Sequence, residues 1–399
     1  MLKRKISEID LLRGISFLAI VLQHALASFI YLPASSASNA LVSAFLLLLI
    51  RFAVPMFVFI TGLVLFYNHS DGELDYPQML KRRFSQVFIP YFVWTLFYFV
   101  WISLISGAGA NSETALLARL ARLIVSGEGY YHLWFMVMIL QFYLVFPLFR
   151  YVVRRGRHWA IAVLGASCLL YFAYLWGYHH LVPGLYERAS LPLFKTLLDY
   201  RDRIFLSWFF YFILGGFAGL YIDRLRSILR RFQSVNWVVN IAAFAVIFHQ
   251  MAQTLTTTPE GLYAINYQLT LPLSYLMMVY LISSVLTFYH LSLTWLPRHQ
   301  WIRRLLRAFG QCSFGCYFAH PFVLHYTDAF TRANFGGLNT IVQIMITFVA
   351  CAGLTLLLSY GLSRMRTPVG DLFVGRVPGA RRKAMPAPTH PPVAPPLDV

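Results

Sequence analysis

Two side chains in the first apolar segment have the types and the spacing of an anion-binding group paired with a proton-transfer group. Arg13 and His24 are eleven residues apart. On an α-helix this spacing places them about 20° from eclipsed and about 16 Å apart along the axis. An arginine can bind a phosphate or carboxylate, and an imidazole can accept a proton from a hydroxyl near neutral pH. A second interpretation stays open, in which Arg13 extends to the membrane surface and His24 hydrogen-bonds a neighbouring helix.

Three further ionisable side chains lie in or beside apolar stretches, where charge is costly in a membrane. Arg51 interrupts one stretch, His320 precedes Pro321 within another, and His132 begins a third. Arg51 faces either a cavity or an acid such as Asp10. His320 is either catalytic or helps to satisfy the carbonyl that Pro321 frees one turn earlier. His132 is expected at the outer rim, where it would meet an outward-facing acceptor.

A basic triplet, Lys81, Arg82 and Arg83, precedes the third apolar segment. It can bind the phosphates of an anionic donor, or it can serve only to set topology and attract anionic lipid. We expect no metal site, because Cys312 and Cys316 lie one helical turn apart without a neighbouring ligand set. The four cysteines are expected to be buried thiols rather than a disulfide framework.

The elements that position these residues are predicted to be membrane-spanning helices. Of the 399 residues, 59% are hydrophobic and 12% are charged, whereas soluble domains have about 45–50% apolar and about 25% charged residues. This composition excludes a soluble globular protein and predicts an all-α polytopic bundle in the plasma or inner membrane. The segments long enough to cross are 12–31, 40–66, 87–106, 133–150, 159–177, 204–222, 237–256, 267–287, 308–327 and 340–362. The second is long and contains Pro55, which predicts a tilt or a kink.

The loops between these ten segments fall into two alternating sets with unequal positive charge. One set, with both ends of the chain, holds 24 of the 33 Lys and Arg residues, whereas the other set holds 7. Cytoplasmic loops carry the excess of Lys and Arg, so both termini are expected in the cytoplasm. The net charge of +18 is then a topology signal, and no nucleic-acid partner is needed to explain it. We expect a transmembrane domain over residues 1–370 and a disordered, Pro-rich cytoplasmic tail over 371–399.

Five short motifs occur in order along this domain. They are Ile9–Gly14 followed by His24, Arg51–Phe57 with Thr61 and Gly62, Arg83 and Phe84 with Ile89–Tyr91 and Trp94, His132–Phe135 with Gln141, Tyr143 and Pro147, and Ser313–Gly315 with Tyr317 and His320. The ordered set resembles the acyltransferase-3 family of bacterial membrane acyltransferases. Many relatives have Arg-x-x-Arg before the third helix, whereas here Arg83 is followed by Gln86. Many also carry a hydrolase-like periplasmic domain, so this chain resembles the stand-alone members that O-acylate polysaccharides or lipid-linked sugars.

The resemblance implies a cytoplasmic acyl-CoA donor, with acetyl or succinyl as the acyl group, and no metal. It implies donor binding by Arg13 with Lys81, Arg82 and Arg83. Catalysis is expected from Arg13, His24, Arg51 and His320, with His24 as general base, and acceptor binding from His132, Trp134 and Tyr317.

Two other functions remain open. A polysaccharide or small-anion transporter would use the same buried charges as a pathway, without consuming acyl-CoA. A non-catalytic partner of a polysaccharide synthase would not depend on His24 for any chemical step. The acyl group, the acceptor and the oligomeric state are not fixed by the sequence, and the partners expected are a glycan or glycolipid acceptor and membrane lipids.

Overall fold

The structure is a computed structural model that describes residues 6–30, 34–70, 72–106, 113–188, 192–365 and 367–375. Within these residues the chain is almost entirely helical, and a single two-stranded hairpin is the only sheet. Eight candidate membrane spans, most of them single helices, are long and apolar enough to cross a bilayer. The prediction of a polytopic, all-α membrane protein is therefore confirmed. The four cysteines are free thiols, as expected.

The helices and strands follow one another along the chain without a repeated unit. The first half contains α1 (Ser7–Ile30), α2 (Ala37–Ile50), α3 (Ala53–Asn68), α4 (Tyr76–Ser106), α5 (Glu113–Ser126), α6 (Trp134–Arg155), η1 (Gly156–Trp159), α7 (Ala160–His180), α8 (Val182–Arg188), α9 (Pro192–Asp199), η2 (Arg201–Arg203) and η3 (Phe205–Ser207). The second half contains α10 (Phe209–Leu220), α11 (Ile222–Arg231), α12 (Gln233–Ala252), β1 (Thr256–Thr257), β2 (Tyr263–Ala264), η4 (Tyr267–Thr270), α13 (Met277–Thr294), α14 (Gln300–Phe335), α15 (Thr340–Arg364) and α16 (Pro368–Val374).

The predicted second segment is interrupted rather than only tilted. Its helix stops at Ile50 and starts again at Ala53, so that Pro55 falls in the first turn of α3. A proline is tolerated there, but deeper in a helix its ring would clash with the carbonyl four residues earlier. That carbonyl belongs to Arg51, which places the break one turn before the proline.

Each of the other predicted segments overlaps one helix, but two of them, 204–222 and 308–327 within α14, are not among the eight candidate spans. The segment 204–222 holds only the 12-residue helix α10, preceded by the short turns η2 and η3. At 1.5 Å per residue, α10 extends about 18 Å, less than the thickness of a bilayer core. The segment 267–287 begins with η4 and turns, and α13 starts only at Met277.

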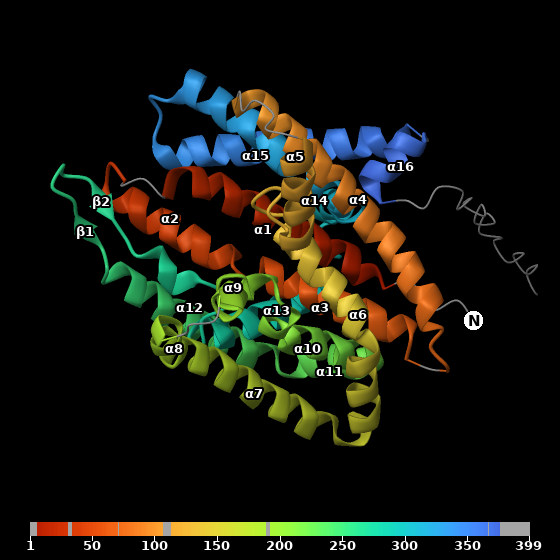
Figure 1. Cartoon of the computed structure of the whole chain (residues 1–399). Coiled ribbons are helices and arrows are strands. Elements are labelled where there is room, and N and C mark those ends of the chain that lie inside the picture. The colour runs from red at the N-terminus through yellow and green to blue at the C-terminus, as the bar shows by residue number, and fades with distance from the viewer. Residues whose placement is uncertain are drawn as a thin grey trace, which may run out of the picture.

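The helix α1 lies in the middle of the molecule, between α14 and α15 on one side and α2 and α3 on the other (Figure 1). Of its most apolar stretch, 72% is buried by the rest of the chain, whereas only 11% is buried in α7 and in α12. The outer helices α7 and α12 therefore present their apolar surface outward, as expected for lipid contact. The residues of α1 instead face protein on most sides.

The connections gather at two opposite ends of the bundle. The β1–β2 hairpin, the α14–α15 turn and α8 lie toward the left of Figure 1, whereas the α3–α4 connection and α16 lie toward the right. The connections on the left belong to the set of loops with few Lys and Arg residues, here called the arginine-poor loops. Those on the right belong to the set with many, the arginine-rich loops. The arginine-poor loops are not plain connections, because they contain the helices α5, α8 and α9.

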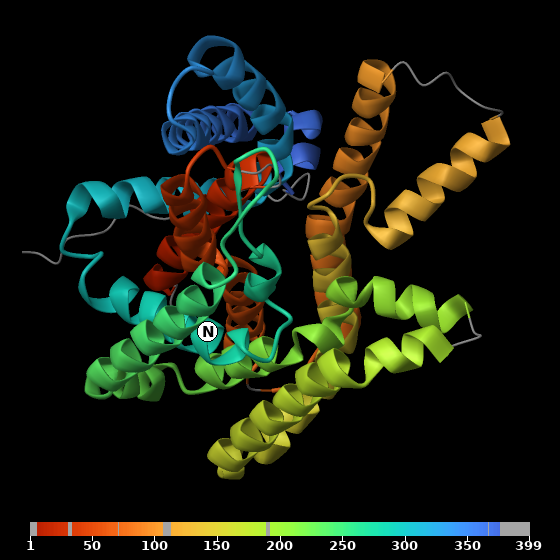
Figure 2. The same ribbon diagram turned by 90° about the vertical axis from the view of Figure 1, so that its left-hand side faces the viewer.

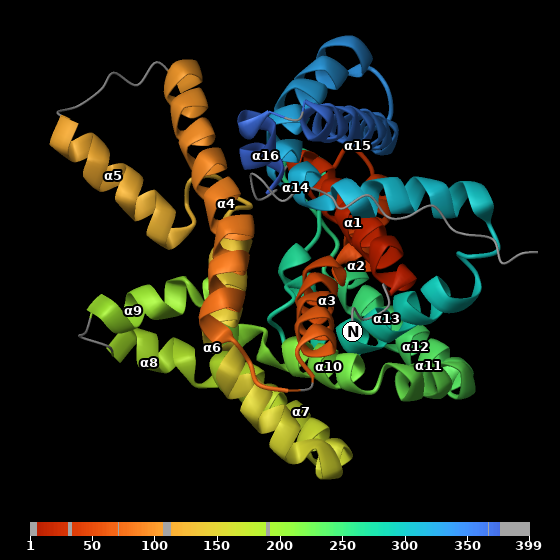
Figure 3. The same ribbon diagram turned by 90° about the vertical axis from the view of Figure 1, so that its right-hand side faces the viewer.

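The helices α4 and α6 form a column beside the main bundle. The helices α5, α8 and α9 project from this column on the side away from α1 (Figure 2; Figure 3). At the other end of the chain, α16 packs against α4, and the Trp94 indole donates a hydrogen bond to the Phe373 carbonyl at 3.1 Å. The first residues of the expected tail, 371–374, belong to α16, and the rest of the tail from residue 376 lies outside the described residues.

Candidate active site

The site is built where α1 crosses α14, and two glycines allow the close approach. A Cβ atom added at Gly14 would overlap the carbonyl oxygen of Leu306, and one added at Gly310 would overlap that of Asp10. Small residues at such crossings let two membrane helices come into backbone contact. The contact fixes the position of His320 on α14 relative to that of His24 on α1.

Three histidines that are far apart in the sequence come together further along α1 and α14, His24 and His320 each lying ten residues beyond these glycines. The rings of His24 and His320 stack with their centroids 5.3 Å apart, and the ring of His132 lies edge-on to His320, also at 5.3 Å. His132 and His320 are buried, whereas His24 is only half-buried. His24 is therefore the histidine that a substrate can reach. In the described part of the chain, no group of three or more His, Cys, Asp or Glu side chains is arranged to bind a metal ion.

The orientation of His320 is set by the proline that follows it. Pro321 cannot donate to the carbonyl of Tyr317, and the Nδ1 of His320 lies 2.7 Å from that oxygen. Because a carbonyl can only accept, Nδ1 carries the proton and Nε2 keeps its lone pair. Nε2 is buried and has no hydrogen-bond partner among the described residues. The structural role of His320 thus leaves its second nitrogen without a proton and without a hydrogen-bond partner among the described residues.

The same helix is opened further by a tyrosine from α4. The Tyr98 hydroxyl donates to the Phe318 carbonyl at 2.6 Å and accepts from the Phe322 amide at 3.3 Å. It therefore replaces one backbone hydrogen bond of α14, which is a known cause of helix kinks. The ring of Tyr98 also lies edge-on to His132, with centroids 5.5 Å apart.

The segment before α6 carries His132 into the cluster. Its backbone carbonyl accepts a hydrogen bond from the Tyr317 hydroxyl, whereas neither ring nitrogen of His132 has a partner among the described residues. Tyr131 precedes it, and its ring packs on that of His24 at a centroid distance of 4.7 Å. Because 47% of Tyr131 is exposed, the cluster approaches the surface on this side.

Arg51 lies in the break between α2 and α3. Its Nε donates a hydrogen bond to Thr270 Oγ1 at 3.0 Å, and its charge lies close enough to His24 to interact with it. Arg51 lies at the C-terminal end of α2, where the helix is interrupted before Ala53. Arg51 therefore supplies a fixed positive charge beside the imidazole of His24.

A second group of charges lies toward the other end of α1. The charge of Arg13 interacts with Asp10 on its own helix, with Arg83 of α4 and with Tyr143 of α6. The Arg83 guanidinium also lies over the Tyr143 ring, 5.9 Å from its centroid. Two guanidinium groups that approach one another form a site for an anion. Of the predicted basic triplet, only Arg83 turns inward, whereas Lys81 and Arg82 are exposed.

The structure thus sorts the predicted residues into two places. His24, Arg51, His132, Tyr317 and His320 lie together, and Arg13 lies with Arg83 about three helical turns away. Trp134 stacks on Trp208, the residue before α10, with centroids 6.2 Å apart.

Sequence reasoning missed two tyrosines that pack on the histidines. Tyr131 contacts His24, and Tyr98 contacts both His132 and the opened turn of α14. The only sequence signal for Tyr131 was its place beside His132 in a run of aromatic residues. Nothing in the sequence indicated that Tyr98 replaces a backbone hydrogen bond.

An interrupted apolar helix, a kinked neighbour and a cluster of membrane-embedded histidines define a polytopic membrane protein with a chemical site in its interior. A family model described as "Acyltransferase domain" matches residues 6–364. The chain belongs to this family, the acyltransferase-3 family, and is an acyltransferase.

Relatives identified by sequence carry two kinds of name. A Bacillus subtilis (strain 168) protein named as membrane-bound acyltransferase YfiQ is 25% identical, over 95% of this chain and 97% of its own length. Proteins of Staphylococcus aureus named as poly-beta-1,6-N-acetyl-D-glucosamine export proteins are 24% identical over 87% of this chain and 90% of theirs. A Staphylococcus epidermidis protein of the same name is 23% identical over 76% of each chain. No solved structure matches this chain.

Proposed function

We propose that this protein transfers an acyl group from a cytoplasmic acyl-CoA to a hydroxyl of a cell-surface polysaccharide or lipid-linked sugar. The observation that carries the proposal is the half-buried His24, stacked on a histidine with an unprotonated ring nitrogen and lying on the same helix as Arg13. The acyltransferase family gives the class of reaction. The donor and the acceptor are what the resemblance to this family implies, and the residue roles combine that resemblance with the geometry.

The donor would bind at the arginine end. Arg13 and Arg83 offer two fixed positive charges to the phosphates of coenzyme A, and the exposed Lys81 and Arg82 would attract the same anion from solution. Many relatives have a second arginine where this chain has Gln86. In this proposal Arg13 supplies the second guanidinium beside the inward-facing Arg83. About 16 Å of helix separates Arg13 from His24, a gap that the extended pantetheine arm would bridge with the acyl thioester at its tip.

His24 would act as general base on the acceptor. Its imidazole takes the proton of the sugar hydroxyl while the oxygen attacks the thioester carbonyl. The carbon–sulfur bond then breaks, the thiolate leaves as coenzyme A and receives that proton from His24, and the ester remains on the sugar. The stacked ring of His320 would hold the imidazole of His24 in place by packing, and Arg51 would stabilise negative charge on the carbonyl oxygen.

The acceptor would approach past Tyr131. His132 and Trp134 were expected to bind it. His132 is buried, so we infer that it shapes the wall, whereas the half-buried Trp134 remains a candidate for contact with the sugar. Tyr317 was expected there too, and its hydroxyl fixes the carbonyl of His132. In this proposal His132 and Tyr317 position the segment before α6, and this segment positions the acceptor. The protein would act in the plasma or inner membrane.

Polysaccharide export is the second candidate, because several relatives are named as export proteins for poly-beta-1,6-N-acetyl-D-glucosamine. These names also make a short β-1,6-linked N-acetylglucosamine oligomer the first acceptor to try. Export without chemistry would move the glycan but would not consume acyl-CoA.

The test uses inverted membrane vesicles that contain the wild-type protein or His24→Gln, supplied with radiolabelled acetyl-CoA or succinyl-CoA. Label should enter the glycan or lipid fraction only with the wild type. A matched control is His180→Gln, because the exposed His180 caps its own helix far from the cluster. Equal labelling by His24→Gln and wild type would remove His24 from the chemistry. No labelling with either acyl-CoA, by folded protein with glycan present, would favour export.

A further inference from the structure

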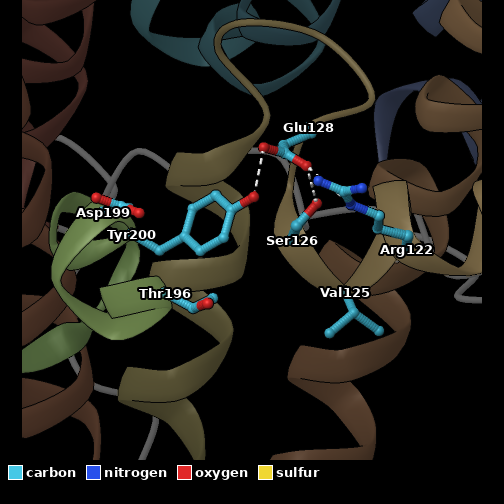
Figure 4. Close-up of a pocket in the computed structure, with 7 residues that line it drawn as sticks. All are labelled: Arg122, Val125, Ser126, Glu128, Thr196, Asp199 and Tyr200. Carbon is cyan, nitrogen blue, oxygen red and sulfur yellow. Dashed lines mark hydrogen bonds and ion pairs between the residues drawn. The ribbon is translucent and has the colours of Figure 1, made fainter. Parts of the chain in front are cut away.

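A cavity of about 730 Å³ lies on the arginine-poor side of the protein, between two of the loop helices. The end of α5 and the residues after it form one wall, with Arg122, Ser126 and Glu128. The end of α9 forms the other, with Asp199 and Tyr200 (Figure 4). Both walls belong to loops that the distribution of Lys and Arg places outside the cytoplasm.

The two walls are tied together by hydrogen bonds around Glu128. The Tyr200 hydroxyl donates to Glu128 Oε1 at 2.7 Å, and the Ser126 hydroxyl donates to Oε2 at 3.0 Å. The bond from Tyr200 lowers the pKa of Glu128, so this group is a carboxylate at neutral pH. Arg203 stacks on the Tyr200 ring at 4.4 Å and donates to the Ser126 carbonyl. The cavity is thus a built feature and not a gap between loose loops.

The groups in the cavity retain capacity to bind a ligand. Asp199 has only one hydrogen bond within the described residues, a long one of 3.5 Å from the Tyr186 hydroxyl, and no ion pair there. Arg122 is 3.7 Å from Glu128, but its side chain is 73% exposed. An exposed guanidinium can donate several hydrogen bonds, and a carboxylate can accept several. The ring of Tyr200 adds an apolar surface to the lining that includes Asp199 and Arg122.

This combination fits the chemistry of an uncharged sugar. Sugar hydroxyls need both acceptors and donors, and the C–H face of the ring packs on an aromatic side chain. Two carboxylates, Glu128 and Asp199, lie beside two arginines, because Arg122 and Arg203 each lie 3.7 Å from Glu128. These charges balance, which suits a ligand without net charge.

The cavity is joined to the histidine cluster by one short segment. Glu128 lines the cavity, and four residues later His132 lies in the cluster, so no more than about 14 Å of extended backbone separates them. The segment starts with Gly127, whose φ of +72° few other residues adopt. Tyr130 then stacks on Tyr98 with centroids 4.5 Å apart. These contacts hold the cavity at a fixed place relative to His24.

We infer that the cavity between α5 and α9 is a binding subsite for an uncharged, hydroxyl-rich sugar unit of the acceptor, one or more units away from the unit that is acylated. The inference rests on the proposed function, because the subsite would hold the acceptor so that a neighbouring unit reaches His24. It assigns binding roles to Asp199, Tyr200 and Arg122, none of which belongs to the histidine cluster.

The first experiment measures acyl transfer by purified protein in nanodiscs as the concentration of a β-1,6-linked N-acetylglucosamine pentamer is varied. Asp199→Asn should raise the KM for the pentamer about tenfold, since it removes a charged hydrogen-bond acceptor. The kcat, the KM for acyl-CoA and the acyl-CoA hydrolysis without glycan should stay unchanged. The control is Glu260→Gln, an exposed carboxylate in the β1–β2 hairpin, which should leave every value unchanged.

A second experiment separates this inference from the proposed function. Binding of neutral oligomers of N-acetylglucosamine, glucose and mannose is titrated by intrinsic fluorescence without acyl-CoA. Binding of any of them to the wild type that weakens in Asp199→Asn and in Tyr200→Ala supports the subsite even if no acyl transfer occurs. Equal binding by the wild type and both variants overturns it, and so does the absence of binding to all three oligomers. Failure of the proposed function would instead appear as binding without transfer.

Discussion

At the Arg13 end of α1, two guanidinium groups share Tyr143 as a neighbour, whereas at the His24 end the neighbouring groups are imidazoles packed on one another. The first arrangement carries positive charge at every physiological pH. The second consists of imidazoles, which can accept a proton from a reacting hydroxyl. In the proposed function, this difference becomes a division of work along one helix, with anion binding at one end and proton transfer at the other.

The two ends are also built differently. The arginines lie within helices, Arg13 in α1 and Arg83 in α4. The histidine end depends on three departures from regular helix, which are the break at Arg51, the kink before Pro321 and the non-helical segment that carries His132. Irregular backbone in a membrane protein is tolerated where it is covered by protein or lines a cavity, and here it supplies the chemical groups.

The largest effect is expected from His24→Gln. Removal of a general base lowers kcat by about 10²–10⁴-fold, and glutamine preserves much of the side-chain volume. The KM for acyl-CoA should change little, because the donor phosphates bind at the other end of α1. Steady-state transfer kinetics measure both values. A large rise in the KM for acyl-CoA would contradict the division between the two ends.

A smaller loss, of about 10²-fold in kcat, is expected from His320→Asn. The asparagine amide can still donate to the Tyr317 carbonyl, so the kinked turn of α14 is retained, but the unprotonated Nε2 is lost. Thermal unfolding in detergent should match the wild type, and the pH dependence of kcat should flatten. Unchanged kinetics in a folded His320→Asn protein would reduce His320 to a structural residue.

At the arginine end, Arg13→Gln and Arg83→Gln should each raise the KM for acyl-CoA about tenfold, since each removes one charged hydrogen-bond donor. The kcat at saturating donor should be nearly unchanged. The exposed Arg82→Gln is the matched control, with an expected change of about twofold or less. If Arg82→Gln weakened donor binding as much as Arg83→Gln, the inward arginine pair would not be the donor site.

The smallest effect is expected from Thr270→Val. It removes the acceptor of the Arg51 Nε hydrogen bond while keeping the shape of the side chain, and kcat should fall about twofold to tenfold. The same substitution at the exposed Thr256 of β1 should have no effect. A rise in kcat for Thr270→Val would mean that Arg51 is held away from the reacting atoms by this bond.

Much of the fold could be predicted, because runs of apolar residues and the placement of arginine depend only on the membrane. Arg13 and Arg83 were predicted to bind the same donor, because each lies near the cytoplasmic end of a predicted membrane-spanning segment. The spacing of Arg13 and His24 on one helical face follows directly from helix geometry. For these features, the local sequence carries the information.

Other features depend on contacts between distant segments and were not predictable. The break at Arg51 could be suspected from Pro55. The Arg51 side chain, however, is held by a hydrogen bond to Thr270, which is more than 200 residues away. The role of Tyr98 depends on the Phe318 carbonyl and the Phe322 amide of α14, which it bridges. No sequence pattern in α4 predicts this contact. The helices α5 and α9 were read as plain loops, because their short amphipathic patterns lie outside the long apolar runs.

The most direct test uses proteoliposomes in which the protein has a single orientation, with acyl-CoA and acceptor glycan supplied on chosen faces. Transfer is predicted when acyl-CoA is on the Arg13 side and the glycan on the His24 side, and no transfer is predicted when the two are exchanged. Equal transfer in both arrangements, or movement of glycan without loss of acyl-CoA, would contradict the division of work along α1.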